Sequence, residues 1–393
     1  MTIANPATKL SYRNENAARK LEYFFLAYLI YSLTAVPLGI NIPYLAGGWL
    51  SVLAVIAFFS VDWKKSARIP MILILVISVS FLLIQILVYQ VSLSASYMWS
   101  FVMWVVLAAI IFILSGRPGF IKRLAVVMFF IGLYLRLFVI TKMDIIARQR
   151  LDSGSGIDNS NDYAAWMGFC ALVFWLWNWN SANKFQRLLL WILFAVAIFF
   201  LLGTVSRGAL LSVAAGILVG LRNIPKRRWL LVTIILGLSF FIIQTLSNTL
   251  ITNYQERLYE ESGRLSRWPI AIKSFQSHPW LGYGIERVAH KGAGIDITPH
   301  NGILFLGLAS GILPTFFFII MWGLAIFHSY KDKRSAVEDI DTLPLIFFAF
   351  LEMMQSNLYF MSVWSMVALF ACFREELVSE QIQKPLTKRK YIR

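Results

Sequence analysis

The sequence predicts an all-α polytopic membrane protein with about twelve transmembrane helices and one large polar loop. Three observations lead to this prediction. Of the 393 residues, 59% are hydrophobic and only 14% are charged, whereas charged residues make up about a quarter of an ordinary soluble domain. The apolar residues gather in runs that are long enough to cross a bilayer. The basic residues are distributed unequally among the turns that join these runs.

Apolar runs of roughly membrane length occur along most of the chain, and each predicts a helix. The first run is interpreted as a retained helix and not as a signal peptide, because similar runs follow it. The twelve runs are Leu21–Val36, Tyr44–Val61, Ile69–Tyr89, Tyr97–Leu114, Leu124–Ile140, Tyr163–Trp179, Leu188–Gly203, Ala209–Leu221, Trp229–Thr245, Gly302–Phe327, Leu343–Tyr359 and Ser362–Phe373.

These runs divide the chain into four segments. Residues 1–245 hold helices one to nine, residues 246–300 form a polar loop domain, residues 301–373 hold helices ten to twelve, and residues 374–393 form a basic tail suited to anionic lipid. The two cysteines, Cys170 and Cys372, lie inside apolar runs, so neither a disulfide framework nor a zinc pattern is predicted.

The basic residues orient the chain. Twelve spans put both termini on one side, and 25 of the 36 Lys and Arg residues then lie on that side, with ten on the other and Arg136 inside a span. By the positive-inside rule both termini are cytoplasmic. This asymmetry explains the net charge of +16 as topology, so nucleic acid is not an expected partner.

The ten basic residues on the outer side gather in three places. Because exporting positive charge opposes the orientation rule, we expect an anionic ligand on that side. The three groups are Lys142, Arg148 and Arg150 before the sixth span, Arg207 alone before the eighth, and Arg257, Arg264, Arg267, Lys273, Arg287 and Lys291 in the long loop.

Arg207 lies in a short polar break, Gly203–Gly208, between two apolar runs. The span that follows begins at the outer face, so its N-terminal N–H groups and the positive end of its dipole point there. A guanidinium beside such a helix start favours phosphate binding. The alternative is an arginine that extends to lipid head groups.

The long loop predicts an amphipathic helix followed by a turn. Arg264, Trp268, Ala271 and Phe275 share one face of a helix that lies along the membrane surface, and Pro279 ends it. Arg267 lies about one turn from Arg264. The turn that follows is rich in glycine, and its histidine, His278, is given a structural role.

The end of the loop, Thr298–Asn301, predicts the start of the tenth span. Thr298 is the expected N-cap and Pro299 the first helical residue, which puts His300 in the first turn at the outer end. The helix dipole disfavours an imidazolium there, so His300 is a candidate general base. Inside the spans, Arg136 and Glu352 are expected to pair, or Arg136 reaches the phosphate.

Several motifs together resemble the O-antigen ligase/polymerase superfamily. They are Ser206-Arg207-Gly208 between two spans, Gly263-Arg264 with Trp268, the turn His278-Pro279-x-x-Gly282-x-Gly284, His300-Asn301 at a helix start, and Asp158-Asn159-Ser160-Asn161 ahead of the sixth span. The motifs cover about the second half of the chain, and the twelve-span plan covers all of it.

The resemblance implies a C-type, metal-independent, inverting glycosyltransferase at the periplasmic face of the bacterial inner membrane, without a cofactor. The implied donor is an O-antigen glycan on undecaprenyl diphosphate, and the ligase branch uses lipid A-core oligosaccharide as acceptor. Carried onto this chain, His300 would deprotonate the acceptor while Arg207 and Arg264 would bind the diphosphate. The secondary candidates are Arg267, Asn301, Arg136 and Arg150.

Two alternatives to a ligase stay open. An O-antigen polymerase of the same superfamily would use the same donor but a second lipid-linked glycan as acceptor. A single dominant outer loop and modest length favour the ligase. A transporter of lipid-linked glycans would instead need ionisable groups and broken helices near the midplane, and repeated halves.

Overall fold

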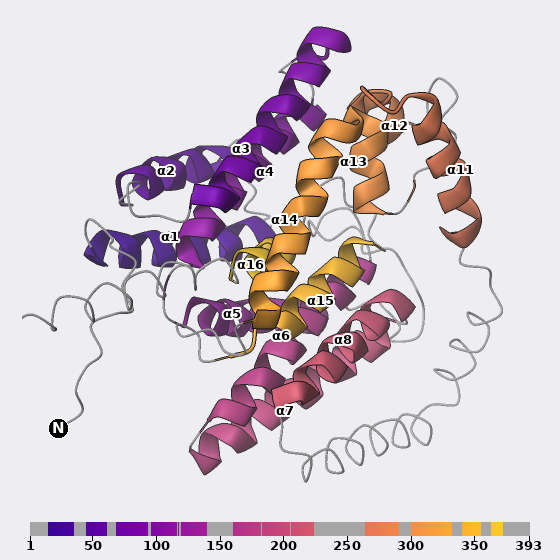
Figure 1. Ribbon diagram of the computed structural model, residues 1–393. Helices are drawn as coiled ribbons and strands as arrows, with labels where there is room; N and C mark the ends of the chain where they lie inside the picture. The colour runs from indigo at the N-terminus through magenta and orange to yellow at the C-terminus, as the bar shows by residue number, and fades with distance from the viewer. Residues whose placement is uncertain are drawn as a thin grey trace, which may run out of the picture.

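The computed structural model describes residues 15–34, 45–60, 68–92, 96–115, 117, 119–139, 160–181, 183–204, 206–223, 264–290, 299, 301–331, 340–354 and 363–371. Every regular element within them is a helix, which confirms the predicted all-α class. Figure 1 shows α1–α4 on one side and α6–α8 on the other, with α14–α16 between them.

Apart from α11 and α12, each described helix lies on a predicted apolar run. The ninth run and the whole C-terminal tail, residues 374–393, lie outside the described residues. The helices are α1 Glu15–Thr34, α2 Leu45–Ser60, α3 Arg68–Leu83 with a π-helical turn Ile84–Val88, α4 Ser96–Leu114, α5 Phe120–Tyr134 with a π-helical turn Leu135–Val139, α6 Ser160–Asn180, α7 Lys184–Gly203, α8 Arg207–Gly220 with a 3-10 turn Leu221–Asn223, α11 Arg264–Ser277, α12 Ile285–His290, α13 Gly302–Ser310, α14 Ile312–Lys331, α15 Leu343–Met353 and α16 Val363–Ala371.

The tenth predicted span is not one helix. Gly311 separates α13 from α14 with φ 77° and ψ −166°, a conformation that glycine alone adopts readily. A β-carbon on Gly307 would lie 3.5 Å from Thr315 Oγ1, although eight residues of a continuous helix extend about 12 Å. The chain therefore reverses at Gly311, and α13 folds back beside α14 (Figure 1). The prediction of a single span, Gly302–Phe327, is therefore wrong. A glycine leaves the run of apolar residues continuous, so the run does not show where the chain reverses.

Close contacts at small residues fix how α6, α8 and α15 pack. A β-carbon on Gly216 of α8 would lie 3.1 Å from Pro344 O of α15. One on Gly168 of α6 would lie 2.8 Å from Val213 of α8 and 3.1 Å from Phe348 of α15. Helices α8 and α15 are therefore antiparallel, with Gly216 opposite Pro344 and Val213 opposite Phe348.

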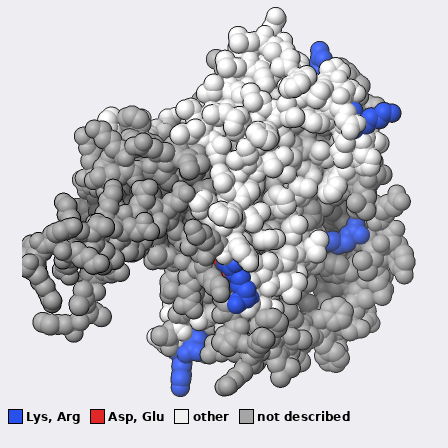
Figure 2. Space-filling model, viewed as in Figure 1, with Lys and Arg blue, Asp and Glu red and all other residues white. Residues whose placement is uncertain are grey.

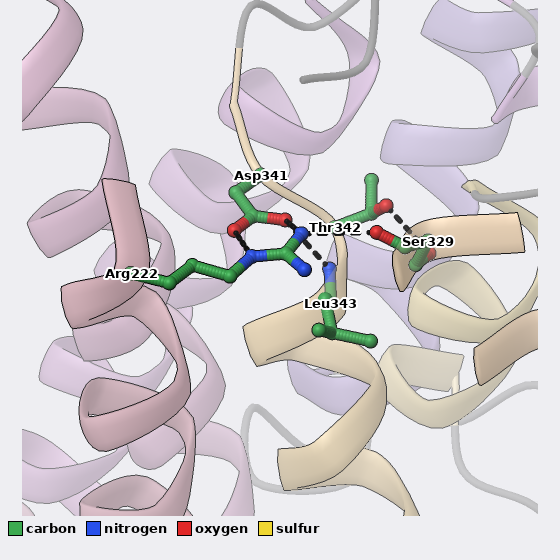
Figure 3. A network of polar contacts seen from close by, with 5 residues as sticks. All are labelled: Arg222, Ser329, Asp341, Thr342 and Leu343. Atoms are coloured by element: carbon green, nitrogen blue, oxygen red, sulfur yellow. Dashed lines mark hydrogen bonds and ion pairs between the residues drawn. The ribbon is translucent and has the colours of Figure 1, made fainter. Parts of the chain in front are cut away.

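One end of this bundle is fixed by an ion pair between Arg222 and Asp341, and we call it the clamp end (Figure 3). The Arg222 guanidinium donates to both Asp341 oxygens, at 2.8 and 2.7 Å, and to Ser329 O at 2.9 Å. Ser329 Oγ and Thr342 Oγ1 are 2.8 Å apart. These contacts tie the end of α8, the end of α14 and the start of α15 together at one level.

A second buried carboxylate joins α1 to α5. Glu22 is 2% exposed at its side chain and pairs with Arg117 at 3.1 Å; Arg123 also donates to it at 3.1 Å. Both ion-pair groups join residues that the sequence places at the cytoplasmic ends of their helices. The pairings thus agree with the predicted arrangement of the helices, while the side of the membrane stays a prediction.

The surface has wide areas without charged side chains (Figure 2). Helix α7 exposes large apolar residues such as Phe185, Leu188 and Phe199, as lipid-facing helices do. Within the described residues, two helices are long and apolar enough to cross a membrane by length and composition: Lys184–Gly203 and Ile312–Tyr330. Shorter apolar helices accompany them, and the number twelve stays a prediction.

Candidate functional site

Helix α8 begins at Arg207, two residues before the predicted run Ala209–Leu221. Ser206 is its N-cap: the backbone is extended and Oγ accepts from Ala209 N at 3.5 Å. The buried Thr204 hydroxyl accepts from Ser206 N at 3.3 Å and holds the turn before it. Arg207 is half-buried in the first turn, beside the positive end of the helix dipole.

Helix α13 begins at Gly302, later than the sequence predicts. Asn301 is the N-cap, with Oδ1 accepting from Ile303 N at 3.0 Å and Leu304 N at 3.1 Å. The prediction that Thr298 caps the helix, with His300 in its first turn, is wrong. The side-chain amide oxygen of Asn301 accepts from two helix N–H groups at once, so the helix starts after this residue. Asn301 is thereby a buried structural residue.

The start of α13 contacts the end of α15. Asn301 Nδ2 lies 3.5 Å from Met354 Sδ. A β-carbon on Gly302 would lie only 2.8 Å from Met353 Cγ, so the small size of glycine permits this approach. Gly216 of α8 lies opposite Pro344 of α15. Met354 is ten residues, or about 15 Å, further along α15. Because the two helices are antiparallel, Met354 lies level with Arg207 at the start of α8.

The starts of α8 and α13 therefore lie at one level, beside the C-terminal end of α15. Helix α8 runs from this level toward the clamp end, and α13 runs from it in the opposite direction, toward Gly311 (Figure 1). Thr342 and Ser329 both lie at the clamp end. Along α15, Met354 lies twelve residues, or about 18 Å, from Thr342, and along α14, Ile312 lies seventeen residues, or about 25 Å, from Ser329. The start of α13 is thus recessed by several ångströms relative to the Gly311 turn. The half of the bundle that contains the start of α13 and the Gly311 turn is called the loop end.

Helix α11 packs against α13 through the face that the sequence predicts. Ala271 is 2% exposed, and Phe275 would lie 3.2 Å from a β-carbon on Gly307. Trp268 Nε1 donates to Pro299 O at 3.0 Å. The first turns of α11, where Arg264 stands, are therefore attached to the segment directly before α13.

The glycine-rich turn after α11 rests on the α13–α14 reversal. Tyr283 N donates to Leu308 O at 2.6 Å, and Ile312 N donates to Pro279 O at 2.8 Å. The His278 ring is 4.3 Å from the Tyr283 ring, which fits the structural role expected of this histidine. Gln85 and Tyr89 also contact this region, and neither residue was predicted from the sequence. The one feature of the sequence that could have indicated them is the presence of an amide, Gln85, and a phenol, Tyr89, at the end of the apolar run Ile69–Tyr89.

The other candidates are less closely connected to this level. Arg267 is exposed on α11. Arg136 is half-buried in the π-helical turn after α5, one turn beyond Gly132, whose carbonyl accepts from Tyr163 Oη at 3.1 Å. Glu352 is buried on α15, and its pairing with Arg136 stays a prediction. His300, Arg150 and the side chain of Arg264 lie outside the described residues.

Two helix N-termini and a guanidinium at one level favour an anionic ligand. The N–H groups that lack intrahelical partners and the positive ends of the helix dipoles both attract negative charge. Among the described residues, no group of three or more His, Cys, Asp or Glu side chains is placed to hold a metal ion. That the reaction needs no metal stays a prediction.

The described residues form an all-helical protein in which two helices are long and apolar enough to cross a membrane, and two helix starts lie level with Arg207. Residues 192–319, from α7 to α14, match the family described as O-antigen ligase. The chain is also similar to the O-antigen ligase of Pseudomonas aeruginosa, with 29% identity over 86 residues, which are 20% of this chain and 21% of that protein. These matches confirm the resemblance to the O-antigen ligase/polymerase superfamily. No solved structure is significantly similar.

Proposed function

We propose that this protein is an O-antigen ligase, which transfers a glycan from undecaprenyl diphosphate to lipid A-core oligosaccharide. The observation that carries the proposal is that two helix N-termini lie at the level of Arg207, inside the region that matches the ligase family. A diphosphate is an anion of the kind that such a position favours. The same site serves a leaving group whose negative charge grows during the reaction.

In the proposed reaction, Arg207 and Arg264 bind the diphosphate and His300 accepts the proton of the acceptor hydroxyl. The hydroxyl oxygen attacks the anomeric carbon, and the bond from that carbon to the diphosphate oxygen breaks. Undecaprenyl diphosphate leaves, and the anomeric configuration inverts. The two guanidinium groups stabilise the charge on the departing oxygens, which is the task that a metal ion performs in other enzymes.

The proposed location is the bacterial inner membrane, with both termini cytoplasmic and the site periplasmic. The Arg222–Asp341 pair at the clamp end and the Arg117–Glu22 pair between α1 and α5 support it, because both join residues that the charge pattern places on the cytoplasmic side. Reporter enzymes fused at residue 393 and inserted after residue 280 test this orientation. We expect cytoplasmic activity from the first and periplasmic activity from the second.

The function is tested in a bacterium that lacks its own ligase but makes the donor and the acceptor. Wild-type protein should give capped lipid A-core on a gel, and His300→Ala at equal protein level should give only the uncapped form. Capping by His300→Ala at the wild-type rate would contradict the proposed role of His300. If wild type instead lengthens the lipid-linked glycan without capping, the protein is a polymerase.

A further inference from the structure

The turn from His278 to Gly284 packs against the reversal between α13 and α14. At this place one buried side chain forms hydrogen bonds to the ends of two helices. Gln85 is fully buried in the π-helical turn at the end of α3. Its Nε2 donates to Ala309 O at 2.8 Å, and its Oε1 accepts from Ile285 N at 2.8 Å. Ala309 O belongs to the last turn of α13 and Ile285 N to the first of α12, where backbone groups lack intrahelical partners.

Tyr89 attaches the same end of α3 to the turn itself. Its Oη donates to Gly282 O at 2.6 Å. Its ring lies against Gly284, where a β-carbon would be 2.9 Å from Tyr89 Cγ. Gly282 and Gly284 both have positive φ, 70° and 86°, so the turn has the backbone shape that only glycine adopts at low cost. The π-helical turn puts the amide and the phenol on one side of α3, and such turns are frequent at functional sites.

These contacts, which we call the junction, therefore connect the turn, α12 and α13 to the end of α3. Through Gln85 the junction joins α12 to α13, and through Tyr89 it joins the turn to α3. The backbone bonds of Tyr283 and Ile312 add the link to the α13–α14 reversal. Helix α13 is only nine residues, about 13 Å. Whatever fixes its C-terminal end at Ala309 also fixes the position of Asn301 at its start.

We propose that Gln85 and Tyr89 are positioning residues of the transfer site. They hold the α11–α12 segment and α13 in register, and thereby keep the start of α13 at the level of Arg207 and the start of α11 attached to it. Neither residue touches substrate in this arrangement. The role in transfer rests on the proposed function, whereas the role in holding the segment does not.

The test uses the full-length protein in lipid nanodiscs, with Gln85→Met, which keeps the length of the side chain but loses both hydrogen bonds. Hydrogen exchange of the backbone amides of residues 279–288 is one readout, and the kcat and KM for an undecaprenyl-diphosphate-linked glycan are the second. We expect exchange to be about tenfold faster and the donor KM to be about fivefold higher, while exchange in α6 is unchanged. Tyr89→Phe should move both readouts the same way by less.

The matched control is Ser78→Ala, because Ser78 is buried on the same helix, α3, about two turns before Gln85. It should change neither readout. The proposal is overturned if Gln85→Met leaves the exchange of residues 279–288 unchanged, if faster exchange leaves KM unchanged, or if exchange rises equally in α6. If Gln85→Met does not fold, Tyr89→Phe decides by the same criteria. A wild-type protein without transfer, but with the expected exchange pattern, would contradict the proposed function and support the holding role.

Discussion

The two ends of the bundle are built from different interactions. At the clamp end, Arg222 and Asp341 form a largely buried ion pair that also engages Ser329. At the loop end, the junction between the turn and the α13–α14 reversal uses backbone, amide and phenol groups. Three glycines with positive φ, Gly282, Gly284 and Gly311, allow the close approach there.

Because the two ends are built differently, the free energy of unfolding and the transfer rate should respond to different substitutions. The clamp end holds the helices together through charge, so its variants should lower the free energy of unfolding. The loop end sets the relative position of helix starts through short contacts between backbones. Its variants should lower transfer by the protein that remains folded. The following changes are ordered by their expected effect on that transfer rate.

Gly311→Ala should have the largest effect. The alanine β-carbon would overlap the Trp280 carbonyl, and φ 77° is strained for alanine. The α13–α14 reversal should open, and transfer should fall below detection. Gly323→Ala, on the helix α14 that follows the reversal, is the matched control, because its β-carbon would meet open space. Transfer rates at equal amounts of folded protein compare the two variants. Full transfer by Gly311→Ala would show that the reversal does not matter.

Arg207→Ala should lower transfer about 100-fold, the usual cost of losing one group that stabilises developing negative charge. The unfolding temperature should stay near that of the wild type. Lys184→Ala removes the same charge from the exposed start of α7 and should leave the rate unchanged. Equal rates for Arg207→Ala and Lys184→Ala would place the diphosphate elsewhere.

Trp268→Phe should lower transfer about fivefold, because the bond from Nε1 to Pro299 O is worth about 1 kcal/mol. The ring that packs on the loop end is retained. Trp280→Phe makes the same chemical change at a side chain that is 75% exposed, and its rate should match the wild type. If both variants transfer alike, the contact between α11 and the α13 start does not position the site.

Asp341→Asn should change transfer least and stability most clearly. Removing one partner of a buried pair costs about 3 kcal/mol, because the Arg222 charge is left behind. The asparagine Oδ1 can still accept from Leu343 N, as Asp341 Oδ1 does at 3.1 Å. Unfolding in denaturant should show the loss, and adding Arg222→Met should recover part of it. A large loss of transfer per folded molecule would contradict the separation of the two ends.

Local patterns predicted much of the fold. Apolar runs located the helices because membrane-length hydrophobic stretches have few other conformations available. The polar break Gly203–Gly208 located the start of α8 to within two residues, since a polar break between apolar runs is a local signal, although the capping role of Ser206 was not predicted. The apolar face of α11 was also predicted, because Trp268, Ala271 and Phe275 follow helical spacing.

The remaining features depend on contacts between distant segments. Gly311 looks like one more small residue inside an apolar run, and its reversal is stabilised by Pro279, which is remote in sequence. Gln85 ends an apolar run and gives no sign of its partners Ala309 and Ile285. Thr298-Pro299 carries a strong local signal for a helix start, but Asn301 takes that role where α13 meets α15.

The most direct measurement is a structure of the protein with undecaprenyl diphosphate bound in nanodiscs. Diphosphate density should lie between the starts of α8 and α13, within hydrogen-bonding distance of the Arg207 guanidinium, and His300 should face the same space. Diphosphate bound at another surface, or an Arg207 side chain turned into lipid while the ligand is present, would contradict a shared site at these two helix starts.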